Sequence, residues 1–273
     1  MRPKAQPMLL VVLVLVPQLF AANIQRTVSS FVSQAREVEI DEYSSNAAVG
    51  DVPVIVMLSG SGGIQSPNMP FDSQARLFAN QCCRVFLPHY LDVTHGSPSD
   101  PAKHYAIWAQ AVRDALTFIR VETHIPPNRT VLLGYSLGAS VALAAAAGES
   151  LLAGVVVWSG SLPDAYVRAF DRPPPLLILH GARDTVIPVF NARQLAKLCE
   201  MKHGVCKLSI YDEEGHAFSG KGIAQADREV WKFLEGILPA AQKLTQMWDR
   251  RVPNFGAMDL SYIKGCCGFS RLR

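Results

Sequence analysis

The chain has 273 residues, of which 49% are hydrophobic, so it is large enough to fold as one domain around a buried core. Its formal net charge of +3 is spread along the chain without a basic block, which argues against nucleic acid as a partner. The six cysteines lack the C-x-x-C order of a zinc site, and the motifs described below require neither a metal nor an organic cofactor.

The first 22 residues have the layout of a secretory signal peptide. Arg2 and Lys4 precede an apolar run over residues 8–16, and the small residues Ala21 and Ala22 follow it. This apolar run is too short to span a bilayer comfortably. We expect residues 1–22 to be removed during export, so that the protein is secreted or enters the secretory pathway. An uncleaved signal anchor that tethers the protein to a membrane is the alternative.

Apolar runs with strand character alternate with helical patterns over most of the remaining chain. The expected strands cover residues 37–41, 52–58, 83–87, 130–133, 154–158, 176–180 and 207–211. The expected helices cover residues 71–81, 102–123, 139–147, 189–202 and 223–238. Because strands that are apolar throughout are covered on both faces, this order predicts an α/β fold with a mostly parallel, doubly wound sheet of about seven strands. The expected domain is 23–248, and the polar, basic residues 249–273 form an appended tail.

The stretch Gly134-Tyr135-Ser136-Leu137-Gly138 joins an expected buried strand to an alanine-rich helix. A serine at such a turn, with glycine two residues away on each side, is a nucleophile elbow. Side chains in place of the two glycines would crowd the neighbouring strand or helix. The turn directs the Ser136 hydroxyl away from the sheet and leaves the Leu137 N–H at the helix start, where it can face an oxyanion. An ordinary turn with an idle serine is the alternative.

A serine nucleophile needs a base and an orienting carboxylate, which in this kind of fold follow later strands in the order serine, acid, histidine. Asp184 comes just after the expected strand 176–180, and His216 comes just after the expected strand 207–211. We therefore predict a triad of Ser136, Asp184 and His216. Asp212 is an alternative orienting acid, and His180 is expected to pack near the acid loop.

The loop after the strand 52–58 reads Ser59-Gly60-Ser61-Gly62-Gly63 and is expected to supply a second oxyanion donor. Its glycines allow the backbone to approach a ligand closely, and the Ser61 N–H is favoured over that of Gly62. The loop lacks the Gly-Lys-Ser/Thr of a phosphate-binding loop and the spacing of a dinucleotide fingerprint.

The connection between Ser136 and Asp184 leaves no room for a large cap, so an open substrate pocket is expected. Residues 59–70, 89–101 and 159–174 are expected to roof this pocket. His89 and Tyr135 are the candidate substrate-binding residues. An open pocket is suited to small or acyl-chain esters, and a shallow groove could also accept a protein-bound acyl group.

Two further features are typical of exported proteins. Asn128-Arg129-Thr130 is a sequon for N-glycosylation at Asn128, in an expected surface loop. The number of cysteines is even, and Cys199 and Cys206 are the favoured disulfide pair because they flank an expected helix-to-strand connection. The pairing of the remaining cysteines is left open: Cys82, Cys83, Cys266 and Cys267.

Three stretches of this chain, residues 132–139, 179–188 and 214–218, resemble the α/β-hydrolases, and more narrowly their dienelactone-hydrolase-like branch. The resemblance covers residues 50–240 and implies an α/β-hydrolase fold with Ser136 as nucleophile, Asp184 as acid and His216 as base. Dienelactone hydrolases carry cysteine at the nucleophile position, so the serine here indicates a general esterase that cleaves carboxylic esters or thioesters.

Other functions remain open at this point. The acid loop also resembles that of the prolyl-oligopeptidase-type peptidases and of the lysophospholipase/thioesterase group. The alternatives to an esterase are therefore an α/β-hydrolase peptidase or acyltransferase, and a secreted, non-catalytic binding protein on the same scaffold.

Overall fold

The computed structural model describes residues 23–46, 48, 50, 52–95, 100–147 and 151–238. The expected signal peptide (1–22), the domain boundary at residue 248 and the expected tail (249–273) lie outside the described residues, as do Cys266 and Cys267. Among the helices of the described part, none is both long and apolar enough to cross a membrane.

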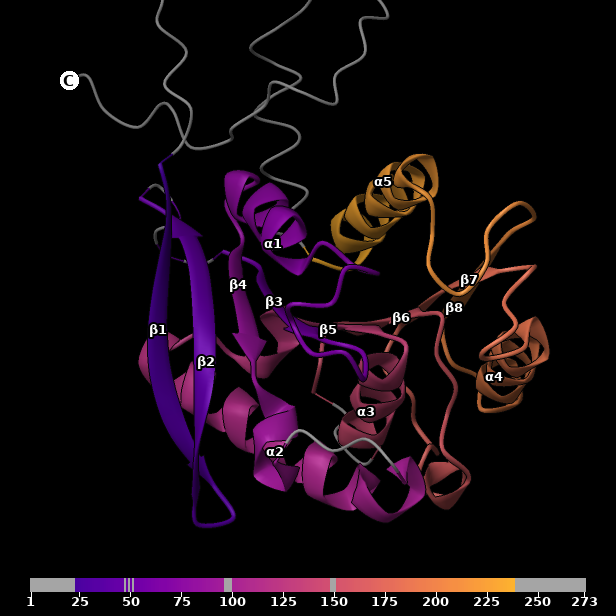
Figure 1. The fold of residues 1–273 in the computed structure, drawn as a ribbon, viewed down its shortest axis with the longest axis horizontal. Coiled ribbons are helices and arrows are strands. Elements are labelled where there is room, and N and C mark those ends of the chain that lie inside the picture. The colour runs from indigo at the N-terminus through magenta and orange to yellow at the C-terminus, as the bar shows by residue number, and fades with distance from the viewer. Residues whose placement is uncertain are drawn as a thin grey trace, which may run out of the picture.

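Eight strands form one sheet in the order β1-β2-β4-β3-β5-β6-β7-β8 (Figure 1). They are β1 (Ile24–Ser33), β2 (Arg36–Ser45), β3 (Val54–Leu58), β4 (Arg84–Pro88), β5 (Thr130–Tyr135), β6 (Gly154–Trp158), β7 (Leu176–Gly181) and β8 (Cys206–Tyr211). Strands β3 to β8 run parallel to one another, whereas β1 and β2 form an antiparallel hairpin whose second strand pairs with β4.

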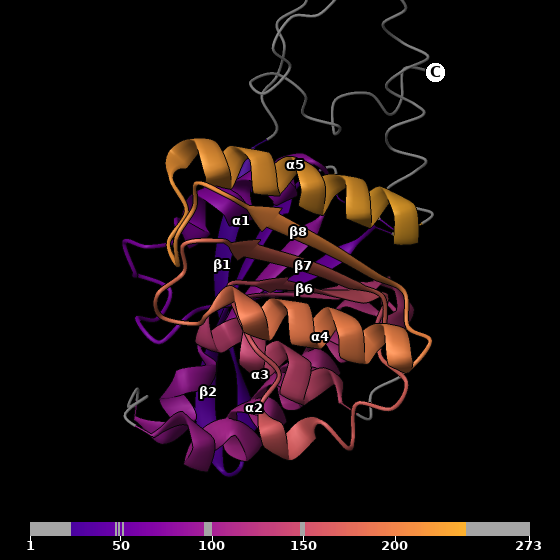
Figure 2. The same cartoon turned by 90° about the vertical axis from the view of Figure 1, so that its right-hand side faces the viewer.

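Helices cover the two faces of this sheet, as predicted. They are α1 (Phe71–Asn80), α2 (Pro101–Thr123), α3 (Leu137–Ala146), α4 (Val189–Met201) and α5 (Gly220–Ile237), with short 3₁₀ turns η1 (Tyr90–Thr94), η2 (Pro127–Arg129) and η3 (Asp164–Tyr166). Helices α1 and α5 lie over one face, and α2, α3 and α4 lie over the other (Figure 2). The predicted α/β-hydrolase architecture is therefore confirmed.

The central strands explain why one edge of the sheet carries the candidate site. Every residue of β3, β5, β6 and β7 is buried, because both faces of the sheet are covered by helices. Polar side chains can then emerge only where these strands end. In an open parallel sheet, ligands bind beyond the carboxyl ends of the strands. Only the short η3 turn interrupts the described connection between β6 and β7, so no large cap intervenes there.

The predicted strand at residues 37–41 lies within β2, which extends over ten residues, and the sheet has one strand, β1, that was not predicted. The strand β1 was missed because most of its residues are exposed, so no alternation of apolar and polar residues marks it. Its hairpin turn uses Gln34 and Ala35, both at positive φ, in place of the usual glycine or asparagine.

The favoured disulfide is confirmed. Cys199 in α4 and Cys206 at the start of β8 are bonded, and the two residues close a short connection at the edge of the sheet. This bond ties the last turn of α4 to the strand that precedes the loop containing His216.

Candidate active site

Ser136 lies at the turn between β5 and α3. Its backbone has φ +55° and ψ −122°, a region that residues other than glycine rarely adopt. The Ser136 N–H donates a hydrogen bond to the backbone carbonyl oxygen of Trp158 in the neighbouring strand, at 2.9 Å. The surrounding fold thus holds Ser136 in a strained turn, as the elbow motif predicts.

The two glycines of the elbow allow the backbone contacts that the sequence analysis predicted. A Cβ atom at Gly134 would overlap the backbone of Ala139 in α3. A Cβ atom at Gly138 would overlap the backbone carbonyl groups of Leu58 and Ser59, at the end of β3. The strand, the helix and the loop after β3 can therefore pack closely around Ser136 only because these two positions lack side chains.

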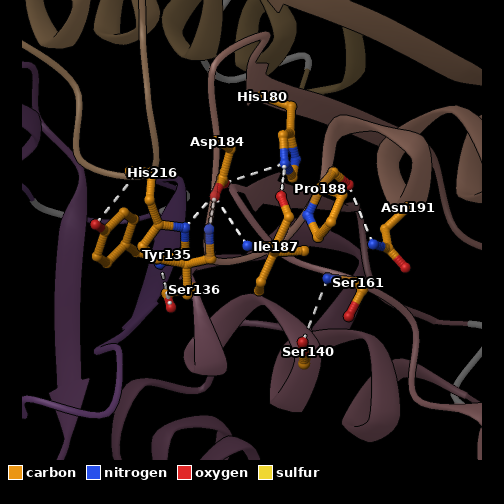
Figure 3. Close-up of polar contacts among 11 residues, drawn as sticks. Tyr135, Ser136, Ser140, Ser161, His180, Asp184, Ile187, Pro188, Asn191 and His216 are labelled. Atoms are coloured by element: carbon orange, nitrogen blue, oxygen red, sulfur yellow. Dashed lines mark hydrogen bonds and ion pairs between the residues drawn. The ribbon is translucent and has the colours of Figure 1, made fainter.

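The structure brings together the three residues predicted to form the triad. The His216 Nε2 atom lies 2.8 Å from the Ser136 Oγ atom, and the His216 Nδ1 atom lies 2.8 Å from the Asp184 Oδ2 atom (Figure 3). The three residues follow β5, β7 and β8, respectively. The Asp184 side chain is fully buried, and that of His216 is 15% exposed. This geometry can transfer a proton from a serine hydroxyl to an imidazole.

The acid loop holds the Asp184 carboxylate through several donors. Its Oδ1 atom accepts hydrogen bonds from the backbone N–H groups of Val186 and Ile187, at 2.9 and 2.8 Å. His180 packs against the same loop, as expected, with its Nε2 atom 3.2 Å from the Asp184 Oδ2 atom. The alternative acid Asp212 is exposed, and the carboxylate that contacts His216 in the structure is that of Asp184.

Tyr135 contacts the histidine of this group. Its hydroxyl donates a hydrogen bond to the backbone carbonyl oxygen of His216 at 3.3 Å, and the two ring centroids lie 5.6 Å apart. Burial raises the pKa of Tyr135 to about 12, so its hydroxyl stays protonated. Tyr135 is only 3% exposed, and the contact described for it at this site is with His216. The predicted contact of Tyr135 with substrate stays a prediction.

The predicted oxyanion loop also lies beside Ser136. A Cβ atom built on Gly60 would be 3.3 Å from the Ser136 Cβ atom. The next two residues, Ser61 and Gly62, line a pocket of about 280 Å³. Leu137 is the first residue of α3, so its N–H belongs to the helix turn whose donors have no partner within the helix. Gly60 and Leu137 therefore lie next to Ser136, and the role of the Ser61 and Gly62 N–H groups as oxyanion donors stays a prediction.

One wall of this pocket comes from the loop after β3 and the other from the segment after β4. The lining residues are Ser59, Ser61, Gly62, Gly63, Ile64, Gln65, His89, Leu91 and Asp92. His89 is thus part of the pocket, as expected, and residues 159–174 do not contribute to its lining. Substrate binding by His89 stays a prediction.

A buried carboxylate that the sequence pattern did not indicate lies next to His89. Asp41 in β2 is fully buried and accepts two hydrogen bonds from Arg26 in β1, at 3.0 and 3.1 Å. Its Oδ2 atom also lies 3.4 Å from the His89 Nε2 atom. Asp41 shares a face of β2 with Glu39 and Tyr43, opposite Val38 and Ile40, so no apolar pattern marks it as buried.

Two further predictions are glycosylation at Asn128 and a site without metal ligands. Asn128 lies in the η2 turn and is exposed, so its amide is accessible from solvent. Within the described residues, no group of three or more His, Cys, Asp or Glu side chains could hold a metal ion.

The sequence of the chain matches the model of the dienelactone hydrolase family over residues 41–237. The chain belongs to the dienelactone hydrolase family. This match covers every residue of the predicted triad and both predicted oxyanion segments. No curated protein matches the chain by sequence.

Solved structures of other hydrolase-fold proteins are similar to this family member. The dienelactone hydrolase-like promiscuous phosphotriesterase P91 from metagenomic libraries has 14% identity and a TM-score of 0.67, over 78% of this chain and 98% of its own. Esterase 2 of Thermogutta terrifontis, phosphorylated by paraoxon, has 17% identity and a TM-score of 0.64, over 81% and 96%. Acylaminoacyl peptidase of Pyrococcus horikoshii has 13% identity and a TM-score of 0.62, over 78% and 41%. At these identities, the likeness concerns the fold alone.

Proposed function

We propose that this protein is a serine hydrolase that cleaves carboxylic esters or thioesters through an acyl-enzyme. The observation that carries this proposal is the continuous series of contacts from Asp184 through His216 to Ser136, with 2.8 Å at each step. A buried carboxylate, an imidazole and a hydroxyl in this order activate the hydroxyl as a nucleophile.

In the proposed reaction, the His216 Nε2 atom accepts the proton of the Ser136 hydroxyl while the Oγ atom attacks the carbonyl carbon of the ester. Asp184 accepts a hydrogen bond from the Nδ1–H group of His216, which fixes the tautomer that leaves Nε2 free to act as a base. The protonated His216 then gives its proton to the leaving alkoxide or thiolate. Water, activated by the same imidazole, hydrolyses the acyl-enzyme.

The oxyanion of the tetrahedral intermediate would be held by two backbone N–H groups. The proposed donors are those of Leu137, at the start of α3, and Ser61, with Gly62 as the second option. The positive end of the α3 dipole supports the negative charge at this position. Loss of one such donor costs about 10²–10³-fold in kcat in serine hydrolases.

The pocket supports a small-molecule ester as substrate. Its volume is about 280 Å³, and its walls mix polar groups with the apolar side chains of Ile64 and Leu91. Only a short turn interrupts the connection between β6 and β7, so no large cap is inserted there, which leaves room for esters whose alcohol or acyl part extends into solvent.

The decisive experiment is labelling by a fluorophosphonate, followed by turnover of p-nitrophenyl esters graded by acyl length. Wild-type protein should be labelled and should hydrolyse these esters, whereas S136A should do neither. S30A is the matched control, because Ser30 is an exposed serine on β1 that bonds only Glu37 among the contacts described for it. Absence of Ser136-dependent labelling and turnover would favour the non-catalytic binding protein.

The same assay separates the other hydrolytic alternatives. Turnover of a p-nitroanilide at a rate comparable to that of the matched ester would indicate a peptidase, a name that the structurally similar Pyrococcus protein carries. Transfer of the acyl group to an added alcohol in preference to water would indicate an acyltransferase. An ester hydrolase should show neither behaviour.

We also propose that the protein is exported and glycosylated. The signal-like layout of residues 1–22 and the exposed position of Asn128 support this proposal. A membrane-tethered form with an uncleaved signal anchor is the alternative.

A further inference from the structure

His180 is a buried histidine next to the proposed triad, and the proposed mechanism does not use it. It lies near the end of β7, and its side chain is fully buried. Its Nε2 atom is 2.8 Å from the backbone carbonyl oxygen of Ile187 and 3.2 Å from the Oδ2 atom of Asp184 (Figure 3). The ring therefore faces the acid loop from the interior of the sheet.

These contacts determine where the proton of His180 lies. The Ile187 carbonyl oxygen can only accept a hydrogen bond, so the Nε2 atom must carry the hydrogen. The Nδ1 atom is buried and has no hydrogen-bond partner among the described residues. Burial lowers the pKa of His180, which favours the neutral ring. His180 is therefore a neutral imidazole whose single N–H group donates to Ile187 and lies close to the Asp184 carboxylate.

Both oxygens of the Asp184 carboxylate have close polar neighbours. Oδ1 accepts hydrogen bonds from the N–H groups of Val186 and Ile187, Oδ2 accepts one from His216, and the His180 Nε2 atom lies 3.2 Å from Oδ2. Ile187 contacts both partners, because its N–H bonds Asp184 while its carbonyl oxygen bonds His180. These contacts together link the end of β7, the acid loop and the Asp184 carboxylate.

We propose that His180 is a positioning residue for the hydrolytic reaction, which holds the Asp184 carboxylate in the rotation that aims Oδ2 at the Nδ1 atom of His216. This inference rests on the proposed function. Without the N–H group of His180, Oδ2 keeps only His216 as a partner, and the carboxylate can rotate about its backbone-bonded Oδ1. A displacement of about 1 Å in a catalytic arrangement can cost about 10²-fold in rate.

Two substitutions distinguish this role from simple packing. H180F keeps a planar ring of similar size and removes the N–H group, whereas H180Q places an amide N–H near the original Nε2 position. The exposed His124 supplies the control variant H124Q. The kcat and KM for p-nitrophenyl butyrate are measured per active site, with the sites counted by fluorophosphonate titration, so that misfolded protein does not enter the rate.

We expect H180F to lower kcat about 10- to 100-fold with little change in KM, and H180Q to recover most of this loss. The same substitution is then made in D184N, where it should have no further effect, because His180 acts through that carboxylate. A per-site kcat of H180F equal to that of wild type and H124Q would overturn the inference. So would a full additional loss in the double variant. Wild-type protein that lacks Ser136-dependent labelling would instead overturn the proposed function, and this inference with it.

Discussion

Gly181, at the end of β7, lies directly against the backbone of Gly215, the residue that precedes His216. A Cβ atom at position 181 would overlap the carbonyl groups of Glu214 and Gly215. The Arg183 N–H also donates to the Glu214 carbonyl oxygen at 2.9 Å. The acid loop and the histidine loop therefore meet through their backbones, and this contact sets the distance between Asp184 and His216.

We expect G181A to separate these two loops and to lower kcat/KM at least about 100-fold, because a displacement of about 1 Å has that effect on a catalytic arrangement. G215A is the matched control, since a Cβ atom there would make only an ordinary 3.7 Å contact with the Arg183 carbonyl oxygen. Esterase kinetics and thermal unfolding of both variants test this expectation. Equal activity of the two variants would show that the close approach is unimportant.

Replacement of the orienting acid should remove most of the activity. In D184N, the side-chain amide can donate to the Nδ1 atom of His216 and stabilise the tautomer that carries its proton on Nε2, which cannot accept the proton of Ser136. We expect kcat to fall by about 10²–10⁴-fold. D212N should keep near-normal kcat, because Asp212 is exposed. The reverse order of effects would identify Asp212 as the orienting acid.

A buried carboxyl group in α5 should make stability depend on pH. Asp227 accepts a hydrogen bond from Gln74 at 2.8 Å, and burial raises its pKa to about 6 from 3.8. Because the folded state binds this proton more tightly than the unfolded state, the stabilising contribution is present at low pH and is lost as pH rises through about 6.

D227N should therefore raise the free energy of unfolding at pH 7.5 by about 1–3 kcal/mol. Its amide can also donate to the buried Gln74 Oε1 atom, which has no partner in the described structure. Urea unfolding at pH 7.5 and pH 4 checks this, because most of the difference should disappear at pH 4. An equal difference at the two pH values would contradict the role of ionisation.

The disulfide between Cys199 and Cys206 should stabilise the edge of the sheet. The two residues are seven positions apart, and closing a loop of this size is worth about 2–3 kcal/mol through the unfolded chain. The double variant C199A/C206A should lose about this much plus the packing of the buried Cys199 side chain. Denaturant unfolding without reductant measures the loss. An unchanged midpoint would mean that the bond does not constrain the unfolded chain.

Export through a eukaryotic secretory pathway should add a glycan at Asn128, because its side chain is exposed in the η2 turn. Treatment with a peptide N-glycosidase should increase the gel mobility of the secreted wild type and leave N128Q unchanged. Secretion of unmodified wild-type protein would contradict this expectation.

The sequence alone was sufficient to predict the central strands and to indicate three side chains at their ends that the structure brings together. Strands covered on both faces are apolar throughout, so β3, β5, β6 and β7 stand out from their surroundings. Ser136 and Asp184 follow two of these strands, and His216 follows β8, the last strand of the sheet. Their order along the chain could therefore be matched to the order serine, acid, histidine that the fold requires.

The hairpin of β1 and β2 and the contacts between individual side chains could be recognised only in the tertiary structure. β1 is largely exposed, so its residues carry no periodic apolar signal, and the pairing of Arg26 with the buried Asp41 could not be foreseen. The choice between Asp184 and Asp212 and the role inferred for His180 depend on distances between loops that only the folded sheet brings together. Local sequence patterns report burial and backbone conformation, whereas hydrogen bonds between distant segments are decided by packing.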